Sequence, residues 1–566
     1  MTHAAHDDAP RVRVVVLNWN SAEHTRRCVR SLLATDYPAD RLEVVVVDNG
    51  SVDGSVPVLR LLFPQLRILE NGANLGFAEG CNRALRDTDE FDAVALVNND
   101  ATVDPGWLWP LVRTLQDHSD VGAVSPKMLL ATEFTTVVVR AEDRAVLRTA
   151  TVDGLDVTAK VLPGPGTDTV LDQTVGALHH DLRCGRHGEL HVPVVPGPCT
   201  VRLRLDGTAT VAADGAEVLT GDDGAFELTL PAGAPRTRRI NSVGTARTAH
   251  GEGLDRHLGE ADRPFDPEEV PGWSGGGVLL RADYLRSVGC FDPQYFAYYE
   301  DADLSWRGTR RGWRTMTAPT SVLHHQQGAT AGPAWPGFFF LNYRNWLLTT
   351  LRNGDRAQVV EALRTAARYA WGPWRAGVLG RLRRFQRPDW SVAGQWARVA
   401  AGVAVRTPGV VRSRRRRVGT SPTAQVWSSL QPASSPRPPV PRPGGPVVVL
   451  LDVTTLPAGT THAQLAETAR ALVTTPDDAV ELVPVVRAGA GHRRLTRDET
   501  QRLLDPDAVA VAPVGAGAEG LALDGPAPGS VVLGDGPVGP GTVQVPLDLD
   551  RPDDVVRTVT AAVRPG

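Results

Sequence analysis

The chain has 566 residues, a length that predicts roughly three to four globular domains. Apolar residues make up 42% and charged residues 22%, with a net charge of −4, which is ordinary for a protein that buries large cores. The five cysteines are scattered and odd in number, which favours a reducing compartment over a disulfide framework. Residues 1–10 lack the apolar core of a signal peptide, and no run approaches the ~18 apolar residues of a membrane-spanning helix. We therefore expect a cytosolic protein or one bound to a membrane surface.

Three apolar runs in the first hundred residues are predicted to be β-strands. They cover residues 11–17, 42–47 and 94–97. Their β-branched composition is typical of strands that are buried on both faces of a parallel sheet. Segments with helical spacing separate them, so the β-α-β-α-β order predicts a doubly wound α/β sheet.

A polar loop follows each of these strands, at the sheet edge where open α/β sheets bind their ligands. The loops begin at Asn18, at Asp48 and at Asn98. Asp48 can accept a hydrogen bond from a nucleotide base or ribose there. Asp53 is explained equally well as a nucleotide contact and as a turn or helix N-cap residue. The glycine-bearing segment 74–82 enters another helix, which suits a phosphate, but its glycines are also ordinary turn residues.

Three carboxylates stand between aromatic residues further along, in Glu300-Asp301-Ala302-Asp303. The run is predicted to open a short helix that ends near Gly312. Carboxylates are favoured in the first turn of a helix, and one held ionised at a cleft can accept a proton from a hydroxyl. The alternative is an ordinary acidic helix start in which Asp303 pairs with Arg307.

Six short motifs follow one another along the chain. They are Asp48-Asn49-Gly50-Ser51, Asn74-Leu75-Gly76-Phe77, Asn98-Asn99-Asp100, Ser274-Gly275-Gly276-Gly277, Glu300-Asp301-Ala302-Asp303 and His324. Each is weak alone, but their order resembles the motif series of family 2 glycosyltransferases, which are inverting, nucleotide-sugar-dependent enzymes of the GT-A fold. The resemblance is closest to bacterial rhamnosyl- and galactofuranosyltransferases, and it covers residues 11–130 and 240–350.

The resemblance implies that Asp301 is the general base and that Glu300 stands beside it or contacts the acceptor. It also implies that a nucleotide-sugar donor lies against the loops at the strand ends. The residues expected to contact the donor are Asn18, Asp48, Asn74, Gly76, Asn99, Trp273, Gly275 and Gly276. The glycines would let backbone N–H groups approach the sugar, although tight turns would also explain them.

The resemblance further implies a divalent metal, Mg²⁺ or Mn²⁺, held by Asp100 and His324. Such ions prefer oxygen ligands and accept diphosphate oxygens in their shell. Asn98 stands where the family has an aspartate, so only Asp100 brings a full charge there. The neighbouring His325 leaves the histidine register open.

Residues 131–239 do not fit the family pattern. They alternate apolar and polar residues between glycines and prolines, which predicts a small antiparallel β-domain inserted between catalytic segments 11–130 and 240–345. It could recognise acceptor glycan or brace an oligomer. Five side chains also suggest a metal site, although their spacing fits no standard zinc pattern: His179, His180, Cys184, His187 and His191.

Residues 346–418 combine many arginines with tryptophan and leucine, which is typical of basic amphipathic helices at an anionic membrane surface. A nucleic-acid patch is the rival interpretation, but no binding motif accompanies it. Residues 419–445 are rich in proline and serine and are predicted to be a linker. Residues 446–566 are predicted to form an accessory α/β domain of unknown role.

Together these features predict a metal-dependent, inverting glycosyltransferase at the inner face of the plasma membrane. It would move a sugar from a UDP- or dTDP-sugar to a hydroxyl of a lipid-linked or cell-wall glycan. A sugar nucleotidyltransferase shares a similar sheet but would carry a glycine-rich basic loop after the first strand, which Asn18-Trp19-Asn20 is not. A non-catalytic nucleotide-sugar- or glycan-binding protein is the other alternative, but we would expect it to lack Asp100 or Asp301.

Overall fold

The computed structural model describes residues 9–172, 179–221, 224–326, 337–384, 387–388 and 390–415, and the backbone of five strands between 447 and 545. The chain divides into two units. The first consists of Met1–Leu17, Cys28–Val47 and Leu75–Pro443, and the second of Asn18–Arg27, Asp48–Asn74 and Gly444–Gly566. The expected linker at 419–445 lies outside the described residues.

The catalytic sheet of the first unit has the strand order β2-β1-β4-β20-β6. β1 (Val12–Asn18) and β4 (Ala93–Val97) run parallel, and β20 (Gly277–Arg281) runs antiparallel to β4. All of β4 and nearly all of β1 are buried, which explains their unbroken apolar sequences. The predicted α/β fold of the GT-A type, with a mixed sheet, is confirmed.

The other elements of the catalytic region are short. The helices are α1 (Ala22–Leu33), α2 (Ser55–Leu62), α3 (Gly76–Leu85), α4 (Leu108–Asp117), α5 (Ala282–Val288) and α6 (Glu300–Thr309). The strands are β2 (Leu42–Asp48), β3 (Arg67–Glu70), β5 (Ala101–Val103), β17 (Thr237–Val243), β18 (Thr245–Arg247), β19 (Gly253–Asp255) and β21 (Arg314–His325). α4 packs against β6 and β21, so the core lies between the sheet and its helices.

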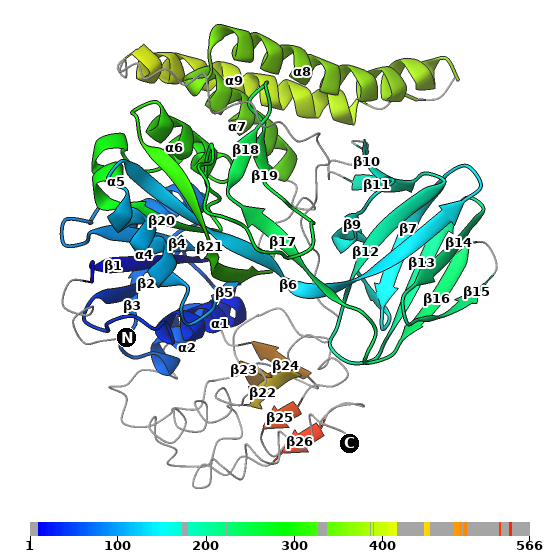
Figure 1. Ribbon diagram of the computed structural model, residues 1–566, viewed down its shortest axis with the longest axis horizontal. Helices are drawn as coiled ribbons and strands as arrows, with labels where there is room; N and C mark the ends of the chain where they lie inside the picture. The colour runs from blue at the N-terminus through cyan, green and yellow to red at the C-terminus, as the bar shows by residue number, and fades with distance from the viewer. Residues whose placement is uncertain are drawn as a thin grey trace. The chain divides into compact units, whose positions relative to one another are not determined.

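β6 (Val121–Ala141) is long enough to belong to two structures (Figure 1). Its first half runs parallel to β21, and its second half pairs antiparallel with β12 (His187–Val194) and β14 (Ala209–Ala213). A second sheet, ordered β10-β11-β7-β13-β16-β15, shares an apolar core with that second half. The antiparallel strands predicted for residues 131–239 are therefore confirmed.

The remaining strands of this inserted segment are short. They are β7 (Ala145–Val152), β8 (Leu155–Asp156), β9 (Leu162–Pro163), β10 (Thr167–Asp172), β11 (His179–Cys184), β13 (Cys199–Asp206), β15 (Glu217–Thr220) and β16 (Ala225–Leu230). Along β13, buried and exposed residues alternate, because one face meets the core and the other meets water.

Three helices follow the catalytic region: α7 (Phe338–Asn353), α8 (Arg356–Trp374) and α9 (Ser391–Arg415). A π-helical stretch, Arg375–Gly380, continues α8. α7 packs against α6, α8 and α9 around an aromatic core that contains Phe339, Tyr343 and Trp346. The predicted helices are confirmed, and within the described ranges none is long and apolar enough to cross a membrane.

The end of the second unit contributes five strands in the order β24-β23-β22-β25-β26. They are β22 (Val447–Asp452), β23 (Val480–Ala488), β24 (Gly491–Arg494), β25 (Val531–Leu533) and β26 (Val543–Val545). β24 is antiparallel to its neighbour, and the other pairs are parallel. A mostly parallel sheet agrees with the predicted α/β character of this segment.

Candidate functional site

In the second unit, Asp48 shapes the loop that follows β2. Its Oδ1 accepts a hydrogen bond from Asn18 Nδ2 at 2.8 Å, and its Oδ2 accepts from the N–H groups of Gly50 and Ser51 at 3.0 and 2.9 Å. Both Asp48 and Asn18 are 0% exposed. These two side chains hold the loop in shape, and a donor contact by either stays a prediction.

Asp53 behaves as a turn residue, in agreement with one of its two interpretations. Its carboxylate accepts hydrogen bonds from the N–H groups of Ala22 at 3.2 Å and Ser55 at 3.0 Å. Asn74, in contrast, is exposed, and its Oδ1 accepts from Asn49 Nδ2 at 3.4 Å. Of the donor-binding residues predicted in this unit, Asn74 alone has a side chain open to solvent.

In the first unit, the glycine loop, residues 274–277, contacts the acidic helix α6. The N–H of Gly275 donates to Asp301 Oδ2 at 2.8 Å, and the N–H of Ala302 donates to Oδ1 at 2.7 Å. Burial raises the pKa of Asp301, while these hydrogen bonds and the charge of Arg247 act against the rise. A carboxylate with a raised pKa is a better proton acceptor than an ordinary aspartate.

Glu300 differs from Asp301 in its surroundings. It is 5% exposed, and its Oε2 has no hydrogen-bond partner in the described part of the chain. Burial, and then the negative charge of Asp301, raise the pKa of Glu300 well above its usual range. The two neighbouring carboxyls therefore have different environments, which suits them to different roles in acid–base chemistry.

Arg247 and Asp255 complete this acidic centre, although no sequence motif points to them. The Arg247 guanidinium lies 4.6 Å from the Trp306 ring centre and donates to the carbonyl of Ala302 at 3.3 Å. Burial, together with the charge of Asp301, raises the pKa of Asp255 to about 6, although a hydrogen bond to Ser242 and the charge of His325 act against the rise. Asp255 is thus a third carboxyl close to the predicted base.

The histidine beside Asp100 is His325. Its Nε2 lies 3.0 Å from Asp100 Oδ1, whereas His324 Nε2 lies 3.2 Å from Asp104 Oδ1. The two histidines are consecutive in β21, and consecutive strand residues point to opposite faces. His324, the residue named from the sequence, therefore turns away from Asp100 in this structure.

The Asp100–His325 pair fits a divalent ion. His325 Nδ1 lies 2.6 Å from Asn241 Oδ1 and donates to it, so Nε2, which can donate to Asp100 when it is protonated, would bind an ion once it has lost its proton. Burial opposes a charge on His325, but Asp100 raises the pKa of the imidazole. No group of three His, Cys, Asp or Glu side chains suits a metal among the described residues. Substrate oxygens and water would therefore complete the shell.

Part of the metal site suggested for residues 131–239 lies within the described residues. Cys184 Sγ lies 3.4 Å from Thr167 Oγ1, and His191 Nδ1 lies 2.7 Å from an Arg239 nitrogen. The side chains of His179 and His180 lie outside the described residues. Cys184 and His191 therefore have protein partners other than one another.

The loop at residues 274–277 lies between the Asp100–His325 pair and Asp301, the predicted base. The N–H of Asn98 donates to the Gly276 carbonyl at 3.1 Å, and a Cβ on Gly276 would lie 3.6 Å from the His325 ring. Trp273 is 0% exposed, so its ring supports the loop from within the core. Asn99 is 8% exposed, next to Asp100. These motifs, separate in the sequence, therefore form one site in the first unit.

The backbone conformation at position 76 explains why this residue is a glycine. Its φ is +77°, and a Cβ there would lie 2.6 Å from the Phe296 ring. A larger residue would be strained and would collide with the segment that precedes α6. The turn interpretation of this glycine therefore has a definite physical cause, and its contact with a donor stays a prediction.

Comparisons with known proteins identify the family that residues 13–130 resemble. Residues 13–130 match the family model Glycosyl transferase family 2. The chain is 25% identical over 330 residues to the N-acetylglucosaminyl-diphospho-decaprenol L-rhamnosyltransferase of two Mycobacterium tuberculosis strains, a match covering 56% of this chain and 76% of that enzyme. It is 28% identical over 109 residues to glycosyltransferase AglE of Haloferax volcanii, covering 19% of this chain and 36% of that protein.

Among solved structures, GalNAc-T7 with UDP, GalNAc and Mn²⁺ aligns with a TM-score of 0.37 and 12% identity. That alignment covers 71% of this chain and 59% of the other. The family model and the rhamnosyltransferase match extend the resemblance carried by the six motifs. The chain thus contains a family 2 glycosyltransferase domain at residues 13–130 and resembles the rhamnosyltransferases of that family.

Proposed function

We propose that this protein is an inverting, metal-dependent glycosyltransferase. It moves a sugar from a UDP- or dTDP-sugar to a hydroxyl of a lipid-linked or cell-wall glycan. The observation that carries the proposal is the position of Asp301, whose carboxylate is held by two backbone N–H groups beside the loop that leads to Asp100 and His325. The M. tuberculosis relative, named for a decaprenol-linked acceptor, supports the acceptor class.

In this mechanism Asp301 takes the proton from the acceptor hydroxyl. The acceptor oxygen attacks the anomeric carbon from the face opposite the diphosphate, whose bond to the sugar breaks, so the configuration inverts. The Gly275 N–H fixes the carboxylate without neutralising it. A positioned base of this kind contributes about 10²–10⁴ in rate. Glu300, whose pKa is raised by burial, stands beside it and hydrogen-bonds the acceptor.

Asp100 and His325 are the residues that would hold Mg²⁺ or Mn²⁺. The ion would supply positive charge that stabilises the leaving diphosphate. Asn241 supports this arrangement by fixing the ring orientation of His325. His324, the histidine implied by the family motif, contacts Asp104 and is left out of the ligand set.

The donor is proposed to contact the polar loops that follow the strands. The contacts come from Asn18, Asp48, Asn74, Gly76, Asn99, Gly275 and Gly276, with Trp273 beneath the glycine loop. Asn74 is exposed and can reach a ligand directly, whereas the N–H of Gly275 already donates to Asp301 and that of Gly276 to Ser274 Oγ. Asp48 and Asn18 would act by shaping their loop as well as by any direct contact.

We place the enzyme at the cytoplasmic face of an anionic membrane. Trp371 and Trp390 are 58% and 59% exposed, on a helical region rich in arginine. Tryptophan with arginine suits the interface of an anionic bilayer. All five cysteines lie in the described part of the chain, and none forms a disulfide, as expected in a reducing compartment.

Vesicle sedimentation tests the membrane proposal. Trp371→Ser combined with Trp390→Ser should weaken binding to vesicles containing anionic lipid by at least about tenfold. The double variant loses two exposed rings that would be buried in the bilayer interface. Leu219→Ser is the matched control, since Leu219 is 58% exposed on the inserted segment. Equal binding by all three proteins would contradict a membrane role for these helices, and binding only to nucleic acid would favour the rival interpretation.

The catalytic proposal is tested with a panel of nucleotide sugars, each incubated with Mn²⁺, Mg²⁺ or EDTA and a polyprenyl-diphosphate-linked acceptor. We expect one UDP- or dTDP-sugar to be consumed only with metal, and the product to show the opposite anomeric configuration by NMR. Retained configuration, or full turnover in EDTA, would refute the proposed mechanism.

A further inference from the structure

We propose that α7 positions the catalytic base and that Asn345 is the residue through which it does so. The inference rests on the proposed function, because it takes Asp301 as the base. Its basis is separate: the strained segment in front of α6 and the contacts that hold it. Asn345 touches none of the proposed substrates and is therefore a positioning residue.

The segment that leads into α6 has an unusual backbone. Phe296, Tyr298 and Tyr299 have φ angles of 67°, 68° and 69°, in the left-handed region that bulky residues rarely adopt. Tyr299 is the N-cap of α6, and no side chain caps this helix end. Such a conformation persists only where the surroundings enforce it. Glu300 and Asp301 follow directly, so their position depends on this segment.

Asn345 supplies much of that enforcement. Its Nδ2 donates to the carbonyls of Tyr295, Ala297 and Tyr298 at 2.9, 2.8 and 2.7 Å. The residue is 0% exposed. Its Oδ1 accepts from Arg344 Nε at 2.8 Å, which keeps the amide nitrogen turned toward the segment. The two N–H bonds of this one amide are thus shared among three carbonyls of the segment that precedes α6.

Arg344 reinforces the same clamp. Its guanidinium donates to the carbonyls of Gln294 at 3.0 Å and Tyr295 at 2.9 Å. On the other side, the carbonyl of Phe296 accepts from the N–H of Ala78 at 3.1 Å, at the start of α3. The strained segment is therefore held between α3 and α7.

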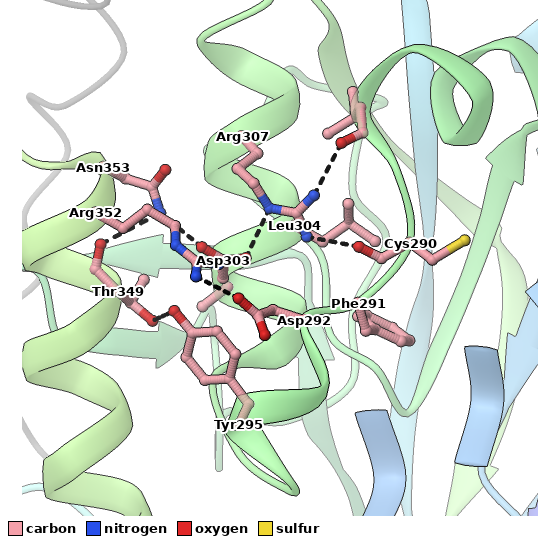
Figure 2. A network of polar contacts seen from close by, with 12 residues as sticks. Cys290, Phe291, Asp292, Tyr295, Asp303, Leu304, Arg307, Thr349, Arg352 and Asn353 are labelled. Carbon is pink, nitrogen blue, oxygen red and sulfur yellow. Dashed lines mark hydrogen bonds and ion pairs between the residues drawn. The ribbon is translucent and has the colours of Figure 1, made fainter. Parts of the chain in front are cut away.

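α7 also grips α6 two residues beyond the base, as Figure 2 shows. Asp303 accepts from Arg307 Nε at 2.7 Å within α6, and from Arg352 at 3.2 Å and Asn353 at 2.9 Å in α7. Thr349 Oγ1 donates to the Tyr295 hydroxyl at 2.9 Å. The two sets of contacts have different effects. The Asp303 network fixes α6 itself, whereas Asn345 fixes the backbone segment that precedes the base.

This arrangement predicts a specific defect. Asn345→Ala leaves Asp301 and its Gly275 contact chemically intact but removes three hydrogen bonds that hold the segment. A base displaced by about 1 Å can cost about 100-fold in rate. We expect kcat to fall by about 10- to 100-fold, with the donor KM and the nucleotide affinity changed by less than about threefold.

The test compares kcat, donor KM, the pH dependence of kcat and the thermal midpoint in the full-length enzyme. Arg344→Lys is a milder second variant that keeps the charge but loses the fork. Thr350→Val is the control, because Thr350 is 1% exposed on α7 but its hydroxyl donates only within the helix, to Trp346. We expect Asn345→Ala and Arg344→Lys to lower kcat well beyond the control and to move the acid limb of the pH profile.

A purely structural role would lower the thermal midpoint while leaving kcat per folded enzyme at the control value, and that result would overturn the inference. If Asn345→Ala does not fold, the inference is tested by comparing kcat of Arg344→Lys with that of Thr350→Val. Equal kcat values for these two variants would overturn it. Failure of the proposed function looks different: Asp301→Asn, assayed alongside, would keep wild-type kcat.

Discussion

The buried carboxylate of Asp303 makes the stability of the catalytic region depend on pH. Asp303 is 0% exposed and contacts Arg307, Arg352 and Asn353. Burial alone would raise the pKa of this carboxyl, but the two arginines outweigh it and lower the pKa from 3.8 to about 2. At about 1.36 kcal/mol per pKa unit, the ionised form stabilises the folded state by about 2 kcal/mol.

The sign follows from the direction of the pKa change. The folded pKa is depressed, so the stabilisation is complete above the unfolded pKa near 3.8 and is lost as the pH falls through about 2. Asp303→Asn should therefore lower the free energy of unfolding by at least about 2 kcal/mol at pH 7, because it leaves buried arginines without their carboxylate. The difference from wild type should shrink to about 1 kcal/mol at pH 3.

Urea unfolding followed by tryptophan fluorescence at pH 7, 5 and 3 measures both effects. Asp283→Asn is the matched control, because Asp283 pairs with Arg286 at 2.8 Å on an exposed surface. Its effect should stay within about 0.5 kcal/mol at every pH. An Asp303→Asn difference that is equal at pH 7 and pH 3, or no larger than the control, would refute the reasoning.

Three other predictions concern the site. His325→Ala should raise the Mn²⁺ concentration for half-maximal transfer at least about tenfold, whereas His324→Ala should change it less than about twofold; equal effects would contradict the assignment. Arg247→Met removes a charge that lowers the pKa of Asp301, so the acid limb of the pH–rate profile should move to higher pH, and an unmoved limb would count against that contact. Gly76→Ala should lower the thermal midpoint by several degrees, since its φ is +77°; an unchanged midpoint would show that the turn tolerates a side chain.

Much of the fold could be predicted from local patterns. The runs at 11–17, 42–47 and 94–97 are strongly apolar because their strands are buried on both faces, so sequence alone marks them. The inserted segment could be recognised because alternation follows from one buried face. The ion pair of Asp303 with Arg307 was predictable from helical spacing and is confirmed at 2.7 Å.

The contents of the site were harder to predict, because they depend on tertiary pairing. His324 and His325 are indistinguishable in sequence, and only the register of β21 against its neighbours decides which one faces Asp100. Arg247 and Asp255 lie on a hairpin with no motif and reach the base through the fold of the chain. The sequence offers only an arginine and a carboxylate between residues 240 and 260. Such residues are too common for a reader of the sequence to single them out.

The inserted segment has few means of stacking against a sugar. Its only Phe, Tyr or Trp residues are Phe134 and Phe226, which are 3% and 4% exposed. Sugar recognition by proteins commonly places an aromatic face against the ring, and neither of these is available. Both roles expected for residues 131–239, glycan recognition and bracing of an oligomer, stay predictions.

The most direct test of the central claim is the rate of sugar transfer by Asp301→Asn, measured with Mn²⁺ on the donor that wild type consumes. Asp283→Asn serves as the matched control, and nucleotide binding is measured for all three proteins. We predict that Asp301→Asn loses at least about 100-fold in kcat while it binds nucleotide normally, and that the control retains wild-type activity. Wild-type turnover by Asp301→Asn would contradict the account, because the proton would then leave the acceptor by another route.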